Sequence, residues 1–196
     1  MSYVHRRHDG LRDLFAGFMD EIASEVQTEP QLQPLTGENL PPGANREHDA
    51  RLDIAARGFW QTCEMAFFDV RVFNPFAKSH KRHTLEAVFK QNETIKKTAY
   101  NDRVIQVEHG SFTPIVLSSF GGYGRETSRF VSKLIEKMSE KKDLERSVVA
   151  NYLRSKVSFE LIRSQVACIR GSRGLKKMNV DAGEIEVVNT LATIRE

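Results

Sequence analysis

Residues 65–73, MAFFDVRVF, restrict the fold of this chain most strongly, because Asp69 and Arg71 are the only charged residues in an otherwise apolar run. A segment that is apolar on both faces is typical of a strand in the middle of a sheet. Residues 51–58 form a second strand candidate, separated from the first by a short connection around Trp60. The simplest arrangement of the two segments is an antiparallel hairpin.

A hairpin that is symmetric about residue 61 places Asp53 opposite Asp69 and Arg51 opposite Arg71. Strand alternation then puts all four side chains on one face of the sheet. Two opposed carboxylates repel each other and are costly to desolvate in a mostly apolar strand pair. We expect a divalent cation to hold them, and oxygen-only ligation with room for water favours Mg²⁺ or Mn²⁺ over zinc.

Ion pairing is the alternative explanation for the same two carboxylates. In that interpretation Asp53 and Asp69 form structural salt bridges with arginines of the strands, namely Arg51, Arg57 and Arg71. The spacing of these residues does not distinguish a metal site from a set of ion pairs. Both interpretations stay open at this point.

Hydrophobic periodicity and turn residues predict the remaining elements. Within the first helix after the hairpin, Glu93 and Lys97 are spaced as an i,i+4 pair on the outer side. The expected elements outside the hairpin are a helix from Asp9 to about Glu25, a loop over 31–45, a helix over 84–100, a strand region over 103–118 interrupted by Gly110 and Pro114, and helices over about 126–141 and 144–169.

This order of elements predicts an α/β protein of the α+β kind, because helices and strands alternate within a length that suits one core. Residues 1–142 are expected to form the core of the domain. Residues 143–173 are expected to form a C-terminal helical extension of the same domain. Residues 174–196 form a tail that either stays mobile or adds an edge strand.

Composition excludes several classes of protein. Apolar residues make up 40% of the chain and charged residues 28%, which is ordinary for a folded protein. Cys63 and Cys168 have no ligand spacing, so neither a disulfide framework nor a zinc module is indicated. No segment has the length of a membrane span, and the basic start lacks the apolar stretch of a signal peptide. We therefore expect a nuclear or cytoplasmic protein with no membrane partner.

Basic charge is concentrated in the later part of the chain. Residues 1–60 hold six Arg and no Lys against ten Asp and Glu, whereas residues 61–196 hold 23 Lys and Arg against 16 Asp and Glu. A polyanion would bind to this later part. A solvated basic surface without a partner explains the same charges equally well.

The order of an acidic helix, Leu52-Asp53, a short hairpin, Asp69-Val-Arg71 and a helix with basic residues resembles the PD-(D/E)xK restriction-endonuclease-like superfamily. Within it, the pattern looks most like the endonuclease domain that follows the reverse transcriptase in site-specific non-LTR retrotransposons. The blocks HRRHDGLRDL, ARLDIAARGFW, AFFDVRVFNP, ETIKKTAY and VEHGSFTPIVLSSFGGYG also look like a segment common at the ends of reverse-transcriptase-related proteins, and the resemblance covers about residues 5–173. It implies a mixed central sheet flanked by helices, with additional C-terminal helices. DNA, a second copy of the chain and an attached reverse transcriptase are the partners that it implies.

The resemblance assigns roles to the acidic pair. Asp53 matches the Asp of the PD element and Asp69 matches the acidic residue of the (D/E)xK element, so both would bind Mg²⁺ or Mn²⁺. The sequence departs from the pattern twice, with Leu52 at the position of Pro and Arg71 at the position of the catalytic Lys. Arginine can stabilise negative charge but cannot readily act as a base.

Other positions complete the expected site. In the retrotransposon-type domains the lysine lies on the following helix just before a Tyr, and Lys96 with Tyr100 fits that place on one helical face. His8, Asp9, Asp13 and Glu21 are the first-helix candidates for a further site residue, and His8 and Asp9 are favoured among them. Glu108 is either a further metal ligand or an exposed strand carboxylate. The basic residues expected to contact DNA are Arg51, Arg57, Lys97, Arg163, Arg170 and Arg173.

The implied activity is metal-dependent hydrolysis of DNA phosphodiester bonds, as in the nicking domain of a retroelement protein. The metal would lower the pKa of a water molecule, and Lys96 or Arg71 would stabilise the developing negative charge. The alternatives are a catalytically decayed nuclease fold that binds DNA or serves a structural role, and a nuclease of the Holliday-junction type that cuts branched DNA.

Overall fold

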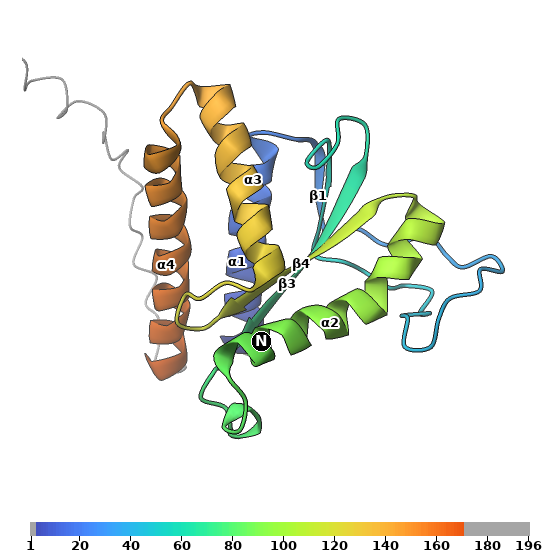
Figure 1. Ribbon diagram of the computed structural model, residues 1–196, viewed down its shortest axis with the longest axis horizontal. Coiled ribbons are helices and arrows are strands. Elements are labelled where there is room, and N and C mark those ends of the chain that lie inside the picture. The colour runs from blue at the N-terminus through green and yellow to red at the C-terminus, as the bar shows by residue number, and fades with distance from the viewer. Residues whose placement is uncertain (1–2, 171–196) are drawn as a thin grey trace, which may run out of the picture.

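A mixed four-stranded sheet with the strand order β1-β2-β3-β4 forms the centre of the computed structural model, which describes residues 3–170. The strands are β1 (Ser24–Thr28), β2 (Ile54–Arg57), β3 (Met65–Phe73) and β4 (Ser111–Ser118). The helices are α1 (Tyr3–Asp20), α2 (Leu85–Arg103), α3 (Arg125–Lys142) and α4 (Arg146–Arg170), with a 3₁₀ turn η1 (Lys78–His80) and a π-helical turn η2 (Val104–Glu108) (Figure 1). The α/β class is therefore confirmed.

The predicted hairpin is present with its predicted register. β2 and β3 are antiparallel, and their partners run from Ile54 opposite Phe68 to Arg57 opposite Met65. Continuing this register by one residue places Asp53 opposite Asp69, immediately before β2 begins.

The register does not continue to Arg51 and Arg71 as expected. The Asp53 carboxylate accepts a hydrogen bond from the amide of Val70 at 2.5 Å. In a regular strand pair a backbone carbonyl would accept from this amide, so the Asp53 side chain takes the place of a ladder partner. Arg51 instead forms an antiparallel bridge with Gln31. Arg51 and Arg71 therefore do not form the cross-strand pair that symmetry predicted.

Helix α2 connects β3 to β4, and these two strands are parallel. A parallel connection needs a crossover, and α2 provides it. Its N-terminus is capped by the hydroxyl of Thr84, which accepts the amide of Ala87 at 3.2 Å. Pro114 lies inside β4, and it is tolerated there because β4 is an edge strand and edge positions can lack an amide donor.

The predicted third strand region begins too early. Residues from Arg103 to Glu108 are helical, so β4 begins only at Ser111. The helical conformation of this segment buries the side chains of Val104 and Val107 in the core. Gly110 then permits a close approach to β3, since a Cβ at this position would collide with the carbonyl oxygen of Met65.

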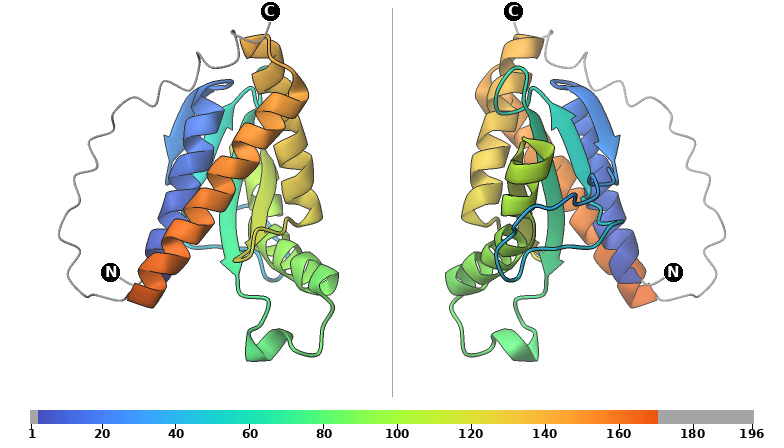
Figure 2. Two further views of the ribbon diagram at one scale, coloured as in Figure 1. Left: turned by 90° about the vertical axis from the view of Figure 1, so that its left-hand side faces the viewer. Right: turned by 90° about the vertical axis from the view of Figure 1, so that its right-hand side faces the viewer.

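The sheet separates two layers of helices. Helices α1, α3 and α4 cover one face and α2 covers the other (Figure 2). The main core lies on the three-helix side, where the ring of Phe130 lies within 5.5 Å of the rings of Phe15, Phe59 and Phe68, centroid to centroid. Burial of several large rings in one cluster supplies much of the apolar stabilisation of a domain of this size.

Strand β1 and the limits of α1 were not predicted correctly. Helix α1 ends at Asp20 rather than near Glu25, and β1 follows it and pairs with β2. The five residues of β1 are polar or half-exposed, so they lack the apolar alternation that identifies a strand in a sequence.

Helix α4 contributes to the same core as the sheet. Its inner face buries Val149, Leu153, Val157 and Leu161 against the α1 side. Its outer face leaves large apolar side chains exposed, among them Phe159. The predicted tail, residues 174–196, lies outside the described residues, as do the last positions of the predicted extension. None of the helices between residues 3 and 170 has the length and apolar character needed to span a bilayer.

A buried arginine fastens the long loop between β1 and β2 to α2. Arg103 is 0% exposed, and its guanidinium donates hydrogen bonds to the carbonyl oxygens of Gln33 (3.0 Å), Asn45 (3.1 Å) and Glu47 (2.6 Å). The loop is therefore held by a buried guanidinium group that donates its hydrogen bonds to three backbone carbonyls instead of to water.

We expect Arg103→Met to lower the free energy of unfolding by about 3 kcal/mol, because carbonyl groups lose their donor inside the protein. Urea unfolding followed by circular dichroism measures this change. Arg163→Met is the matched control: Arg163 is 67% exposed, and its ion pair with Glu160 is a single i,i+3 contact, so its loss should change stability by no more than about 0.5 kcal/mol. Equal effects of the two substitutions would contradict the anchoring role of Arg103.

Candidate active site

Asp53 accepts hydrogen bonds from two parts of the fold. Its Oδ2 atom lies 2.5 Å from the amide nitrogen of Val70 on β3 and 3.0 Å from Nε2 of His8 on α1. The other ring nitrogen of His8 lies 3.4 Å from Oδ1 of Asp9. The two favoured first-helix candidates therefore form one chain of contacts that ends at the strand carboxylate.

Asp69 is the buried member of the acidic pair. Its residue exposure is 5%, and Lys96 of α2 contacts it with Nζ at 3.0 Å from Oδ1 and 2.8 Å from Oδ2. Only the contact to Oδ1 has hydrogen-bond geometry, so Oδ2 is a buried oxygen that has a nearby charge but no hydrogen-bond donor. Burial raises the pKa of Asp69 above its ordinary value, Lys96 opposes that rise, and the negative charge of Asp53 adds to it.

His8 is cationic in this arrangement at neutral pH. Its hydrogen bond to Asp53 raises the pKa of the imidazole from the ordinary 6.5 to about 9, against the opposing effect of partial burial. The charges of Asp53, Asp9 and Asp69 act in the same direction as the hydrogen bond. The acidic pair is thus neutralised by one histidine and one lysine, and the predicted alternative of strand arginines as partners is wrong.

A small cleft lies beside the acidic pair. It has a volume of about 220 Å³, and apart from Val70 and Val72 its lining side chains are basic: Arg7, His8, Arg71 and Lys96. The Nε atom of Arg7 is buried and has no hydrogen-bond partner among the described residues. The cleft therefore combines several cationic groups with one unused donor, and two of its lining residues, His8 and Lys96, contact the acidic pair.

The donor set fits a hard divalent cation. Mg²⁺ is commonly bound by one or two carboxylates while it keeps several waters and contacts substrate phosphates. Asp53 and Asp69 would supply the two carboxylates, with Oδ2 of Asp69 as an oxygen that no hydrogen bond uses. Within residues 3–170 no group of three or more His, Cys, Asp or Glu side chains converges, so the protein itself offers this pair and no larger set.

Several predicted site residues lie elsewhere. Glu108 was expected on a strand and lies instead at the end of η2, where its carboxylate accepts the backbone amide of Gln33 at 2.6 Å. Tyr100 shares a helical face with Lys96, and the Nζ atom of Lys96 lies 5.8 Å from the centroid of the Tyr100 ring. The hydroxyl of Tyr100 accepts a hydrogen bond from Asn45 at 3.3 Å. The side chain of Tyr100 therefore supports Lys96 and does not reach the acidic pair with its hydroxyl.

The residues predicted to contact DNA are distributed over the surface. Arg57 pairs with Glu25 at 2.8 Å, Lys97 with Glu126 at 2.9 Å and Arg163 with Glu160 at 2.7 Å. Arg51 is exposed beside the long loop. The side chain of Arg170 and the whole of Arg173 lie outside the described part of the chain. None of the described members of this set lines the cleft.

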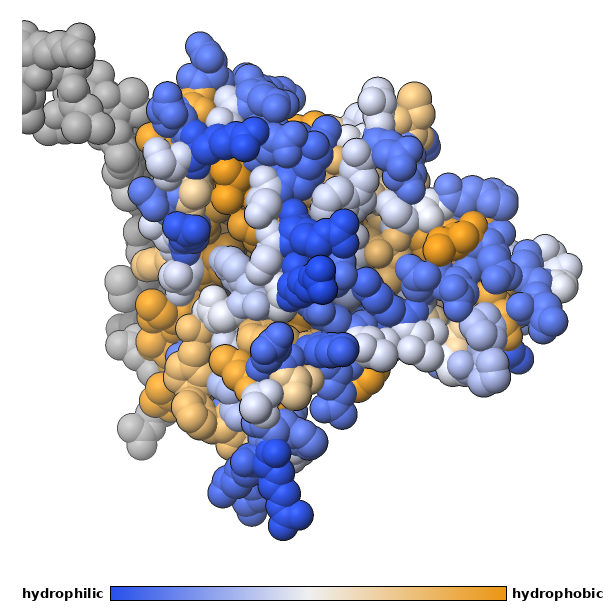
Figure 3. Space-filling view, in the orientation of Figure 1, coloured by the Kyte–Doolittle hydropathy of each residue, from blue (hydrophilic) through white to orange (hydrophobic). Residues whose placement is uncertain are grey.

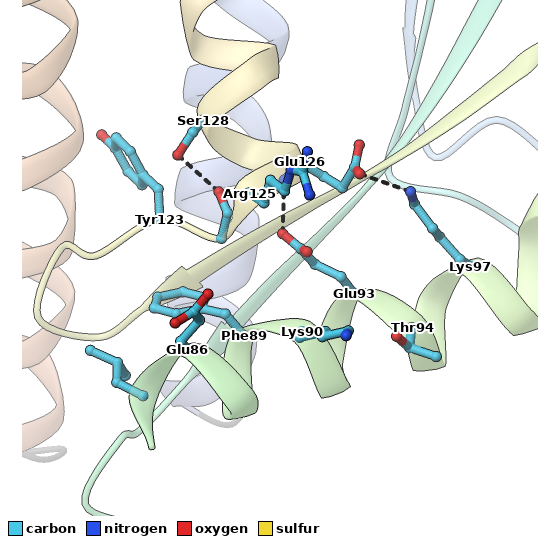
Figure 4. Close-up of a pocket in the computed structure, with 12 residues that line it drawn as sticks. Glu86, Phe89, Lys90, Glu93, Thr94, Lys97, Tyr123, Arg125, Glu126 and Ser128 are labelled. Carbon is cyan, nitrogen blue, oxygen red and sulfur yellow. Dashed lines mark hydrogen bonds and ion pairs between the residues drawn. The ribbon is translucent and has the colours of Figure 1, made fainter. Parts of the chain in front are cut away.

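A larger hollow of about 830 Å³ lies between α2 and α3 (Figure 4). Glu93, which was expected on the outer side of α2, is 8% exposed and points to the N-terminus of α3, where it accepts the amide of Glu126 at 2.9 Å. Gly124 leaves room for the Glu93 carboxylate in this position, because a Cβ there would displace it. This carboxylate caps α3 and occupies the position that an anion would take at the helix end.

Sequence reasoning missed Arg7. It stands next to His8 in the HRRHDG block, and α1 presents both to the cleft. No motif position marked it, and adjacent basic residues near the start of a chain are usually solvated. Only the docking of α1 against the sheet shows that Arg7 belongs to the cleft.

No family model matches the chain, and no curated protein matches it either.

The pKa of His8 predicts how stability depends on pH. The folded state binds the imidazole proton more tightly than the unfolded state. The protonated His8 therefore contributes fully to the free energy of unfolding below pH 6.5, and this contribution is lost as pH rises through about 9. We expect the free energy of unfolding to fall across this window, and His8→Gln to remove that part of the slope. Chemical unfolding at several pH values measures both curves. Identical slopes for the two proteins would show that the His8–Asp53 pair does not form.

Proposed function

We propose that this protein is a metal-dependent DNA endonuclease built on a restriction-endonuclease-like fold. The observation that supports the proposal most strongly is the contact of Asp53 with His8 and of Asp69 with Lys96, because both cations line a cleft whose polar lining is basic. A phosphodiester carries one negative charge and gains a second during attack by water. Such a cleft offers cations for the phosphate and oxygen ligands for a metal within one site.

The order of elements around the site supports the same proposal. Asp53 precedes β2, Asp69 lies on β3, and Lys96 lies on the helix that follows β3. This is the order that the sequence resemblance implied for the acidic pair and for a lysine displaced to the helix. Arg71, which stands at the motif lysine position, lines the cleft, while the ammonium in contact with Asp69 comes from Lys96.

Each side chain has a distinct proposed role. A bound Mg²⁺ or Mn²⁺ would lower the pKa of a water molecule and neutralise charge on the scissile phosphate. Asp53 and Asp69 would hold that ion, and the hydrogen bonds from His8 and Val70 keep the Asp53 carboxylate in place. The ammonium group of Lys96 would move from Asp69 to the phosphate, and the flexible stem of the lysine side chain allows this movement.

Arg7 and Arg71 would bind and orient the phosphate. Both guanidinium groups line the cleft, and the buried Nε of Arg7 lacks an acceptor among residues 3–170. A planar guanidinium donates to two phosphate oxygens at once, which fixes orientation as well as charge. Neither group can serve as a base at neutral pH.

The acidic pair provides the main test. We expect Asp53→Asn and Asp69→Asn each to reduce plasmid nicking in Mg²⁺ or Mn²⁺ by about 100-fold or more, because each removes an anionic metal ligand while keeping the side-chain shape. Asp20→Asn, at the exposed end of α1, is the matched control and should leave the rate unchanged. Undiminished nicking by both site variants would exclude this centre as the source of activity.

The two neighbouring lysines of α2 provide a second test. We expect Lys96→Met to reduce nicking roughly 10- to 100-fold through the loss of charge stabilisation at the phosphate. Lys97→Met removes the same charge one residue away, where it pairs with Glu126, and should have little effect. Rates are compared at temperatures at which circular dichroism shows both variants folded. Equal losses in the two variants would contradict a specific role for Lys96.

A decayed nuclease fold that binds DNA without cutting it is the second candidate. It is favoured by one observation: His8, Lys96 and the amide of Val70 already neutralise the acidic pair without a metal. Binding of DNA with no nicking in either metal would support this candidate. Branched DNA included in the same assay tests the junction-cutting alternative. The homodimer and the attached reverse transcriptase stay predictions.

A further inference from the structure

The segment from Asn74 to Leu85, which we call the basic loop, extends from the end of β3 away from the sheet. In Figure 1 it is the turn at the bottom of the molecule, between β3 and α2, and in Figure 3 the same region is a strongly hydrophilic projection. It contains Lys78, Lys81 and Arg82 together with two histidines, and it has no acidic residue.

The basic loop is held in one conformation by its own contacts. The Asn74 side chain accepts the amide of Phe76 at 3.0 Å, and the carbonyl of Asn74 contacts the His80 ring at 2.9 Å. The His80 ring also packs edge-on against Phe73, the last residue of β3, with centroids 5.5 Å apart. The loop therefore presents its remaining side chains from a fixed frame, which lowers the entropy lost on binding a ligand.

The three cations of the basic loop have no acidic partner among residues 3–170. Lys78, Lys81 and Arg82 are exposed, and none of them forms an ion pair with a carboxylate of residues 3–170. Other cations of α2 are paired, as Lys96 is with Asp69 and Lys97 with Glu126. The loop is thus a concentration of uncompensated positive charge, which attracts polyanions.

An exposed aromatic pair accompanies these charges. Phe76 of the basic loop and Phe120 of the turn after β4 are 74% and 65% exposed, yet their rings contact each other edge to face with centroids 5.2 Å apart. The two rings pack against each other, and both remain largely exposed to solvent. Exposed aromatic rings on which bases stack are the common device of proteins that bind unpaired nucleic acid.

The basic loop also continues the cleft of the candidate active site. Arg71 and Val72 line that cleft, and Phe76 is only four residues beyond Val72, at most about 14 Å along an extended chain. A strand that has its phosphate beside Asp69 would therefore reach the loop within a few nucleotides.

We infer that the basic loop and the Phe76–Phe120 pair form a binding site for single-stranded DNA, with the phosphates on Lys78, Lys81 and Arg82 and an unpaired base against the two rings. The site would direct an unpaired strand into the cleft, and this placement rests on the proposed nuclease function. In a duplex the faces of the bases are already stacked, so the rings select single strands. Anionic lipid is the competing ligand for exposed rings beside cations, and the test includes it.

Binding is measured by fluorescence anisotropy of the full chain with a short labelled single strand and the matching duplex, in EDTA over a series of salt concentrations. Lys81→Gln/Arg82→Gln should reduce the slope of log Kd against log salt by about 1.4, because each phosphate contact on a single strand contributes about 0.7. The control Lys141→Gln/Arg146→Gln removes equal charge at the α3–α4 connection, at the opposite end of the molecule, and should leave the slope unchanged.

Phe76→Ala and Phe120→Ala should each weaken single-strand binding roughly 5- to 150-fold and leave duplex binding and the salt slope unchanged. Loss of fold is checked by thermal unfolding of each variant, and Phe76→Tyr should restore binding because it keeps a ring. Equal affinity of all variants for the single strand would overturn the inference. So would co-sedimentation with phosphatidylserine vesicles in the absence of oligonucleotide binding. Because EDTA prevents metal-dependent cleavage, failure of nicking leaves this result intact, and failure of binding leaves the nicking test intact.

Discussion

A carboxylate buried in an inner strand of the sheet is the constraint on which the arrangement of this protein depends. Asp69 is 5% exposed and lies opposite Asp53, so two negative charges need compensation within the fold. An unpaired buried charge costs several kcal/mol. Helix α1 brings His8 and helix α2 brings Lys96 from opposite layers, so the docking of both helices is coupled to the same pair of oxygens.

The largest apolar cluster lies on the three-helix face of the sheet, whereas the candidate site receives side chains from both faces. The three-helix face carries the clustered aromatic rings and the inner side of α4. The α2 face carries further polar contacts, including the buried Arg103 and the Glu93 cap of α3. Because buried ion pairs seldom add net stability, the apolar face must offset the cost of the charges at the cleft.

Those parts of the site that depend on local pattern were predictable. The hairpin register follows from the length of the connection and from alternation along β3, so the opposition of Asp53 and Asp69 could be stated in advance. The position of Lys96 on α2 follows from helical spacing and a Thr cap. The polar strand β1, the helical turn after Arg103 and the burial of Glu93 could not be foreseen, because each depends on a neighbour that is distant in sequence.

The sequence by itself determined the two strands of the hairpin, their register and the chemical types of side chain that could meet there. Only the tertiary structure decided which cations meet the acids. His8 reaches Asp53 across 45 residues and Lys96 reaches Asp69 across 27, while Arg57 of β2 pairs with Glu25 instead. The physical reason is that the hairpin register depends on residues close together in sequence. The cations that reach the two carboxylates depend instead on how whole helices pack against the sheet.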